Sequence, residues 1–261
     1  MATLAVVLAF SVLVDIGHAF VAKPSGFAQK SKSTNCRNFF SLSSTSGIKR
    51  SSTSLGYRNL PSLEQVSNDP FSEQIYHASE IMSILKSNQE IVSKAQDKSF
   101  LESEEEQMIS ELMCAQFSHP DGIRGFFTTY LTGEGDALAD MEDVPKPLRD
   151  AMKQANLEDL ASLACMNVIV PIASMSKLSD STLVANAAHT AERAKHILRN
   201  MRGSVNVIRN CAAIYIVAMG IGDKNPEGHN ELILFWNDLF AASNFTDKQK
   251  EDIASAFTDL L

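Results

Sequence analysis

Residues 157–177 read LEDLASLACMNVIVPIASMSK, and this stretch decides the fold class. Its central part, LASLACMNVIVPIASM, contains only one ionisable side chain, that of Cys165. A helix of this length runs for about 30 Å, which is enough to cross a small domain, so we expect it to be the central core helix. Pro171 should kink this helix, or split it after Val170, because proline lacks the N–H that the helix ladder requires.

The segments on both sides of this stretch also show helical patterns. Their apolar residues recur at helical spacing, while alternating runs are short and glycine-bounded hairpin turns are absent. We therefore expect an all-α fold, a single bundle of about eight helices that occupies residues 61–261 as one domain. The expected helices are 69–97, 102–117, 122–132, 145–155, 157–177, 180–201, 204–219, 231–242 and 247–260.

Capping residues mark the starts of several of these helices. An acidic N-cap followed by proline is expected at Asp69 and Pro70. Capping boxes, in which side chains at the N-cap and three positions later satisfy free backbone N–H groups, are expected to begin at Ser99, Ser118 and Thr246.

Charge divides the chain at residue 60. Residues 1–60 carry seven basic side chains and one acidic side chain, which give a charge of +6. Residues 61–261 carry 16 basic and 30 acidic side chains, which give −14, so the net charge of the chain is −8. An acidic body favours solubility and disfavours nucleic-acid binding, which needs lysine and arginine to neutralise phosphates. We therefore expect no nucleic-acid partner.

The first 60 residues have the composition of a targeting region. Residues 4–14, LAVVLAFSVLV, form an apolar run of signal-peptide length, too short for a membrane span. Residues 20–58 are rich in serine, threonine and basic residues and contain no acidic residue, as in transit peptides. We expect a signal peptide over 1–19, a disordered transit-peptide-like segment over 20–60, and no membrane span in the mature chain.

This tandem arrangement resembles the bipartite presequences of diatoms and related algae with secondary plastids. The resemblance implies cleavage between Ala19 and Phe20, with the aromatic residue read at plastid import, and places the mature chain in the plastid stroma. His18 and Asp15 depart from the usual pattern. The alternative is a secretory signal followed by a linker, and thus a secreted protein.

The most unusual local chemistry lies in the segment GIRGFFTTYLT, residues 122–132. Gly122 and Gly125 each cost about 1 kcal/mol relative to alanine inside a helix, which suggests that another backbone or a ligand approaches closely. Arg124 lies between them, and Tyr130 belongs to an aromatic stripe on the same helix. These four residues are candidate binding residues. An Arg124 that faces a cavity would favour a ligand, whereas pairing with Asp121 or Glu134 in a solid core would count against one.

A second candidate is a cluster of cations near the end of the helix predicted over 180–201. The preference of a helix C-terminus for cations can by itself account for the cluster. The alternative interpretation is a docking patch for an anionic ligand or an acidic partner, with Arg199 and Arg202 as its candidate residues. The cluster comprises Arg193, Lys195, Arg199, Arg202 and Arg209.

No catalytic or metal-binding motif was found, and we expect neither cofactor nor metal. Cys114, Cys165 and Cys211 are predicted to fill the core, since no Cys-x-x-Cys pair occurs. Residues 223–228 begin like a calcium loop, but Leu234 stands where the bidentate glutamate is required. The sequence contains no P-loop, no Gly-x-Gly-x-x-Gly and no His-Glu-x-x-His. This favours a non-enzymatic role, and an enzyme whose site is defined by geometry alone stays open.

Two hypotheses for the function follow. The segments DGIRGFFTTYLTGEGD and LASLACMNVIVPIASM are similar to uncharacterised helical proteins of plastids and cyanobacteria, a resemblance that implies no function. The first hypothesis is a stromal protein that binds another protein, as an assembly or regulatory factor of the photosynthetic machinery. The alternative is a small-ligand or pigment-binding protein, or an enzyme, with a pocket near Arg124.

Overall fold

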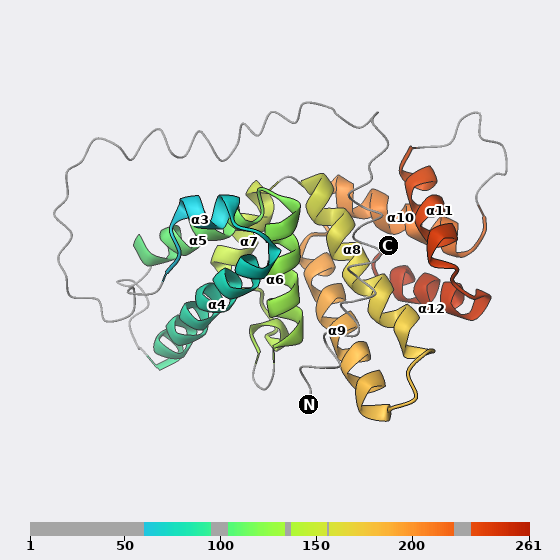
Figure 1. The fold of residues 1–261 in the computed structure, drawn as a ribbon, viewed down its shortest axis with the longest axis horizontal. Coiled ribbons are helices and arrows are strands. Elements are labelled where there is room, and N and C mark those ends of the chain that lie inside the picture. The colour runs from blue at the N-terminus through green and yellow to red at the C-terminus, as the bar shows by residue number, and fades with distance from the viewer. Residues whose placement is uncertain (1–59, 95–103, 134–136, 156, 222–230) are drawn as a thin grey trace. The chain divides into compact units, whose positions relative to one another are not determined.

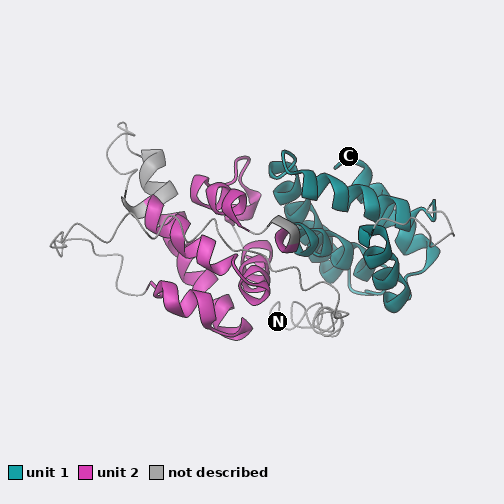
Figure 2. Cartoon of the chain, turned by 90° about the horizontal axis from the view of Figure 1, so that it is seen from above, with its two compact units in different colours: residues 1–31, 161–261 teal, residues 32–160 magenta. Residues whose placement is uncertain are grey.

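The computed structural model describes residues 60–94, 104–133, 137–155, 157–221 and 231–261. Within these ranges the chain forms ten α-helices, one short 3-10 helix and no strand (Figure 1). The predicted all-α fold is confirmed. Two compact units divide the described residues: 161–221 and 231–261 belong to unit 1, and 60–94, 104–133, 137–155 and 157–160 belong to unit 2 (Figure 2). The helices expected in one domain over 61–261 thus fall into two groups.

Unit 2 is built around the packing of α4 along α6, with α5 contacting α3, α4, α6 and α7. Aromatic side chains of the predicted stripe fill its core: Phe126 stacks on Tyr130 with ring centroids 5.2 Å apart and meets Phe117 edge-on at 4.8 Å. The elements of this unit are α3 (Leu63–Asn68), α4 (Phe71–Lys94), α5 (Glu104–Gln116), α6 (Pro120–Thr132), the 3-10 helix η2 (Leu138–Asp140) and α7 (Lys146–Gln154).

In unit 1, α10 packs on both α11 and α12. Its Asn210 accepts hydrogen bonds from Trp236 Nε1 of α11 at 3.1 Å and from Ser162 Oγ of α8 at 3.4 Å. The helices that supply this unit are α8 (Leu157–Met175), α9 (Ser181–Asn200), α10 (Val205–Ala218), α11 (Glu231–Ser243) and α12 (Asp247–Thr258).

Two predicted helix starts differ from the structure. The short helix α3 was not predicted, although Ser62 and Gln65 form its capping box. Asp69 is the C-cap of α3 rather than the N-cap of the next helix, and its carboxylate binds the side chain of His77 instead. At α6 the N-cap is His119 rather than Ser118, because His119 Nδ1 accepts the backbone N–H of Gly122 and proline occupies the first helical position.

Other predicted features hold. Thr246 and Gln249 form the capping box at the start of α12, and Cys114, Cys165 and Cys211 are buried. Three predictions concern residues outside the described ranges. They are the cleavage between Ala19 and Phe20, the capping box at Ser99 and the calcium-like loop at 223–228.

Helix α8 remains one helix through Pro171 and is not split after Val170. Its last turn leaves backbone carbonyls without helical partners, as every helix end does. Gln249 of α12 satisfies one of them: its Nε2 donates to Ala173 O at 2.7 Å and to Ser176 Oγ at 2.9 Å, and the residue is buried. Gln249 thus both caps its own helix and anchors the end of α8.

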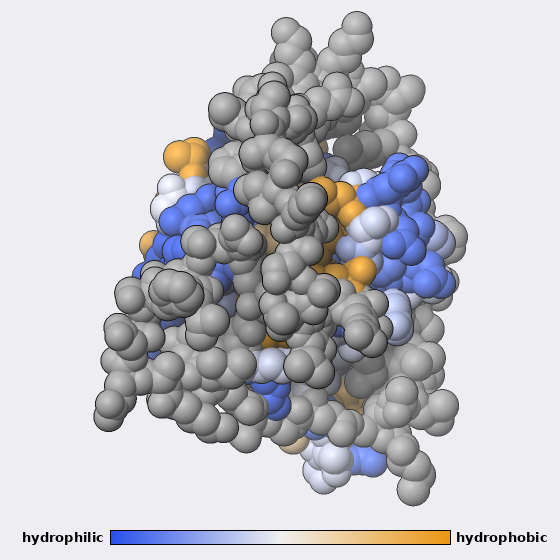
Figure 3. All heavy atoms as spheres, turned by 90° about the vertical axis from the view of Figure 1, so that its left-hand side faces the viewer, coloured by the Kyte–Doolittle hydropathy of each residue, from blue (hydrophilic) through white to orange (hydrophobic). Residues whose placement is uncertain are grey.

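No helix in the described ranges combines the length and the apolar character needed to cross a membrane. On the side of the molecule drawn in Figure 3, the described surface is largely hydrophilic, and hydrophobic colour is confined to small areas.

Replacing Gln249 by alanine should destabilise unit 1 by about 2 kcal/mol, because the substitution removes the donor to Ala173 O and opens the capping box. Urea unfolding followed by the fluorescence of Trp236, the only tryptophan, measures the change. Glu251→Ala, at an exposed position of the same helix, is the control and should leave the midpoint unchanged. Equal midpoints for the two variants would contradict the anchoring role.

Candidate functional site

The glycines of the segment 122–132 allow α6 to approach its neighbours. A Cβ atom built on Gly125 would lie 2.5 Å from Gln74 Cβ and 2.8 Å from Gln74 C, both in α4. A Cβ on Gly122 would lie 1.8 Å from the carbonyl oxygen of Gln116, at the end of α5. Of the two causes considered for the glycine pair, another backbone or a ligand, the structure shows the first.

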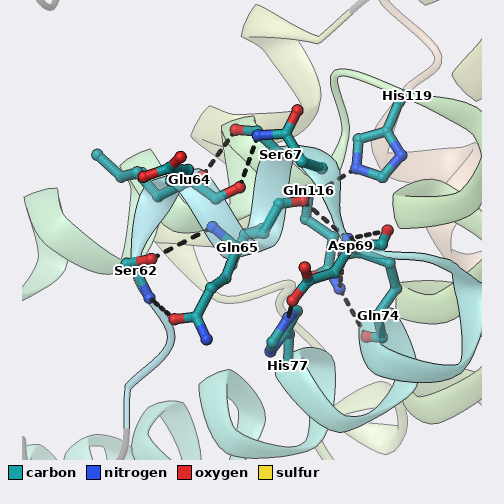
Figure 4. A network of polar contacts seen from close by, with 12 residues as sticks. Ser62, Glu64, Gln65, Ser67, Asp69, Gln74, His77, Gln116 and His119 are labelled. Carbon is teal, nitrogen blue, oxygen red and sulfur yellow. Dashed lines mark hydrogen bonds and ion pairs between the residues drawn. The ribbon is translucent and has the colours of Figure 1, made fainter.

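The residues that these glycines approach, Gln74 and Gln116, belong to a buried polar cluster, which we call the glutamine cluster (Figure 4). Gln74 and Gln116 are both fully buried. Gln74 Nε2 donates to Val66 O at 2.8 Å and to Asp69 O at 3.0 Å, and Gln116 Nε2 donates to Gln74 O at 2.9 Å. Because these bonds join the end of α3 to α4 and α5, the cluster holds together the elements on which α6 packs.

His119 belongs to the same cluster, and its hydrogen bonds define its tautomer. Nδ1 accepts from the backbone N–H of Gly122 at 3.2 Å, so it carries no proton. Nε2 lies 2.9 Å from Val66 O, which can only accept, so Nε2 carries the proton and donates it. Both ring nitrogens are thereby used in positioning α6 against α3.

The cluster also contains an aspartate–histidine pair. His77 Nε2 lies 2.8 Å from Asp69 Oδ2, and the His77 side chain is 5% exposed. Such a pair orients the histidine in catalytic triads, where the second ring nitrogen contacts a nucleophile. Among the described residues His77 Nδ1 has no hydrogen-bond partner, and neither has Gln116 Oε1. The arrangement therefore orients an imidazole but brings no nucleophile to it.

Arg124 and Tyr130 do not converge on one site. The Arg124 guanidinium donates to Asp121 Oδ1 at 2.6 Å and lies 6.0 Å from the centroid of the Phe71 ring, and its side chain is 32% exposed. Tyr130 is buried, and its hydroxyl donates to Leu138 O at 3.3 Å. Six helical positions rotate by about 240°, which places the two side chains on different sides of α6.

Two residues of the predicted cation cluster, Lys195 and Arg199, are paired with acidic side chains within unit 1. The ammonium of Lys195, a buried residue, lies 2.6 Å from Glu192 Oε1, and one guanidinium nitrogen of Arg199 lies 3.9 Å from Glu192 Oε2. Arg202 donates to the backbone oxygen of Asp259 at 2.8 Å, at the C-terminal end of α12, where a helix favours cations. Arg202 and Arg209 nevertheless remain exposed.

Helix α10 carries a feature that the sequence analysis did not identify. Besides its buried face, it presents a line of apolar residues that the core does not cover. Val205 is 67% exposed, Ile208 45% and Met219 48%, and Ala212 and Tyr215 are half-buried. We call these five residues the outer stripe.

The spacing of the outer stripe is three, four, three and four positions, which keeps its members on one side of a helix. The opposite side of α10 is buried through Asn210, Ile214 and Val217. The helix was interpreted as an apolar core helix, and its hydrophobicity around most of its circumference could have indicated two separate contact faces.

No three histidine, cysteine, aspartate or glutamate side chains gather closely enough to hold a metal ion within the described ranges. Comparison with protein-family models, with curated protein sequences and with solved structures finds no match for this chain.

Gly125→Ala should destabilise unit 2 by about 2 kcal/mol, because the overlap with α4 involves backbone atoms and outweighs the ~1 kcal/mol gained from helix propensity. Thermal unfolding followed by far-UV circular dichroism measures this. A Cβ on Gly203 would meet no atom within 4 Å, so Gly203→Ala should leave stability unchanged or slightly raised. A Gly125→Ala protein as stable as the parent chain would refute the close approach.

Proposed function

We propose that this protein acts by binding another protein, and that the outer stripe of α10 is the surface it uses. The exposed apolar line carries the proposal. Removing apolar surface from water contributes about 25 cal/mol of favourable free energy per Å². A partner that covers side chains such as Val205 and Ile208 would gain this free energy. An i, i+3, i+7 arrangement is the form in which one helix recognises another helix or a helix-binding groove.

The charges beside the stripe indicate the chemistry of the partner. Arg209 lies next to the stripe on α10, Arg202 precedes it, and α10 contains no acidic residue. A second copy of this helix would bring only like charges to the contact. An amphipathic helix with acidic residues beside its apolar face would pair with both arginines, so we propose a partner of this kind.

We further propose that this binding takes place in the plastid stroma of an alga with a secondary plastid, where the protein would act as an assembly or regulatory factor. The support is the composition of residues 1–60, with the apolar run followed by a basic segment that is rich in serine and lacks acids.

Ile208→Glu should abolish the association, because it places a charge in the centre of an apolar contact. We expect affinity to fall by at least about 30-fold, the value for a loss of about 2 kcal/mol. Size-exclusion chromatography of the tagged chain from gently lysed algal cells, with mass spectrometry of the co-eluting species, detects the complex. Raising the salt concentration should weaken the complex, since the flanking ion pairs are screened.

The matched control for this experiment is Tyr76→Glu. It also adds a glutamate at an exposed aromatic position, 57% exposed, but on α4 of unit 2. The control should retain the complex. The proposal fails if the parent chain elutes alone, or if Ile208→Glu and Tyr76→Glu behave alike.

Residues 1–60 fused to a fluorescent protein should direct it to the plastid, and Phe20→Ala in the same fusion should stop it before import. Fluorescence microscopy in a diatom reports the location. Secretion of the parent fusion into the medium would show that residues 1–60 are a secretory signal and would overturn the proposed stromal location. The proposal that the outer stripe binds a protein would not depend on this result.

A further inference from the structure

The C-terminal end of α10 places an exposed methionine on an ordered backbone. Met219 is the C-cap of α10 and the last member of the outer stripe, and it is 48% exposed. Gly220 follows it with a φ of 64° and donates its N–H to Val217 O at 3.1 Å. The N–H of Ile221 donates to Ile216 O at 3.1 Å. These bonds form a Schellman motif, which closes a helix end, so the exposed side chain of Met219 stands on a fixed helix terminus.

Met219 is the most exposed methionine in the described ranges, and Met141 of unit 2, at 38%, is the next. A methionine thioether is a soft nucleophile that peroxides convert into a sulfoxide wherever they can reach the sulfur. Exposure therefore makes these two side chains the most reactive ones. The methionines that are buried, and so protected, are Met113, Met152, Met166 and Met201.

We propose that Met219 is a site of reversible oxidation by hydrogen peroxide, and that its oxidation weakens the binding of a protein partner to the outer stripe. This inference rests on the function proposed above for the stripe. Met219 continues the apolar line of Ala212 and Tyr215 at spacings of three and four positions, so a partner helix that lies along the stripe covers its thioether.

The reaction needs only the thioether and the peroxide. The Met219 sulfur attacks one peroxide oxygen, forms a sulfur–oxygen bond and breaks the O–O bond. The hydroxide that leaves takes up the proton of the transferred oxygen and becomes water. The sulfur is oxidised by two electrons and the peroxide is reduced by two, so one thioether and one peroxide give one sulfoxide and one water.

The sulfoxide changes the chemistry of the contact. Its oxygen accepts hydrogen bonds from water in the free chain, and an apolar partner surface offers no donor to replace them. Because leaving a polar group unsatisfied on burial is costly, we expect affinity to fall by about tenfold. A partner that covers the stripe also shields the Met219 sulfur, so oxidation acts on the free chain and prevents it from binding again.

The first part of the test maps oxidation in the purified full chain, treated with hydrogen peroxide at neutral pH. Dithiothreitol then reverses cysteine sulfenic acids and disulfides and leaves methionine sulfoxide in place. The tryptic peptides 210–224 and 125–149 contain Met219 and Met141, and mass spectrometry should show that both methionines gain one oxygen before the buried ones do. Oxidation of the buried Met166 ahead of Met219 would contradict the assignment of the site.

The second part measures binding with the same samples. After catalase has removed the peroxide, the tagged chain is titrated into an algal extract, and size-exclusion chromatography gives the bound fraction. The oxidised parent chain should bind about tenfold more weakly, and methionine sulfoxide reductases A and B, one for each sulfoxide epimer, should restore its binding.

Two variants assign the effect to one sulfur. Met141→Leu removes the other exposed methionine, which lies outside the stripe, and should lose affinity on oxidation as the parent chain does. Met219→Leu keeps an apolar side chain but has no sulfur, so peroxide should leave its affinity at the value measured for this variant before treatment.

The outcomes separate this inference from the proposed function. If the parent chain keeps its complex when Met219 is fully oxidised, or if Met219→Leu loses as much affinity on oxidation as the parent chain, the regulatory role is overturned and the binding role of the stripe stands. If the untreated parent chain elutes alone, the proposed function is overturned, and the regulation of this surface with it.

Discussion

Helix α10 is apolar around most of its circumference, and the core of unit 1 covers only one side of it. The covered side holds the unit together: α11 and α12 pack on α10, and Asn210 accepts hydrogen bonds from α8 and α11. The uncovered side is the outer stripe. One helix therefore supplies both the centre of a fold and an apolar surface exposed to water, and this combination is expected where a protein keeps a surface for a partner.

In unit 2 the unusual residues serve the internal packing of the helices and not a surface for a partner. Its glycines suggest in the sequence a close approach by another backbone or a ligand, and in the structure they serve packing, as do its buried glutamines. Gly125 lets α6 reach α4, Gln74 and Gln116 satisfy the backbone where α3, α4 and α5 meet, and His119 uses both ring nitrogens in the same junction. Since a buried polar group is costly unless hydrogen-bonded, these residues specify one arrangement of the helices. The Arg124 guanidinium forms an ion pair with the Asp121 carboxylate.

Local patterns predicted the helices well, because amphipathic spacing and capping residues act within a few positions. The capping box of Thr246 and Gln249 is an example. The errors arise where a side chain has a distant competitor. Asp69 has the pattern of an N-cap, but the imidazole of His77 binds its carboxylate. Gln249 caps α12 as expected and also reaches 76 positions back to Ala173, a contact that no local pattern indicates. Of the two outcomes expected at Pro171, a kink or a split, the split does not occur.

The candidate site was harder to predict than the fold. The sequence alone indicates that Arg124 and Tyr130 lie on different sides of α6, since six helical positions separate them. The same holds for Arg199, whose partner Glu192 lies two turns earlier on the same helix, whereas the contact of Arg202 with the backbone oxygen of Asp259 arises only from the packing of α12. The outer stripe needed knowledge of which face of α10 the core covers, and no local pattern contains that information.

The most direct measurement is photo-crosslinking from position 208. A photoreactive amino acid incorporated there in algal cells should crosslink to a second protein, at a segment that combines an apolar helical face with acidic residues, and the same amino acid at position 76 should not capture that segment. Crosslinks from position 208 to this chain's own residues, or the same products from both positions, would contradict a partner-binding role for the outer stripe.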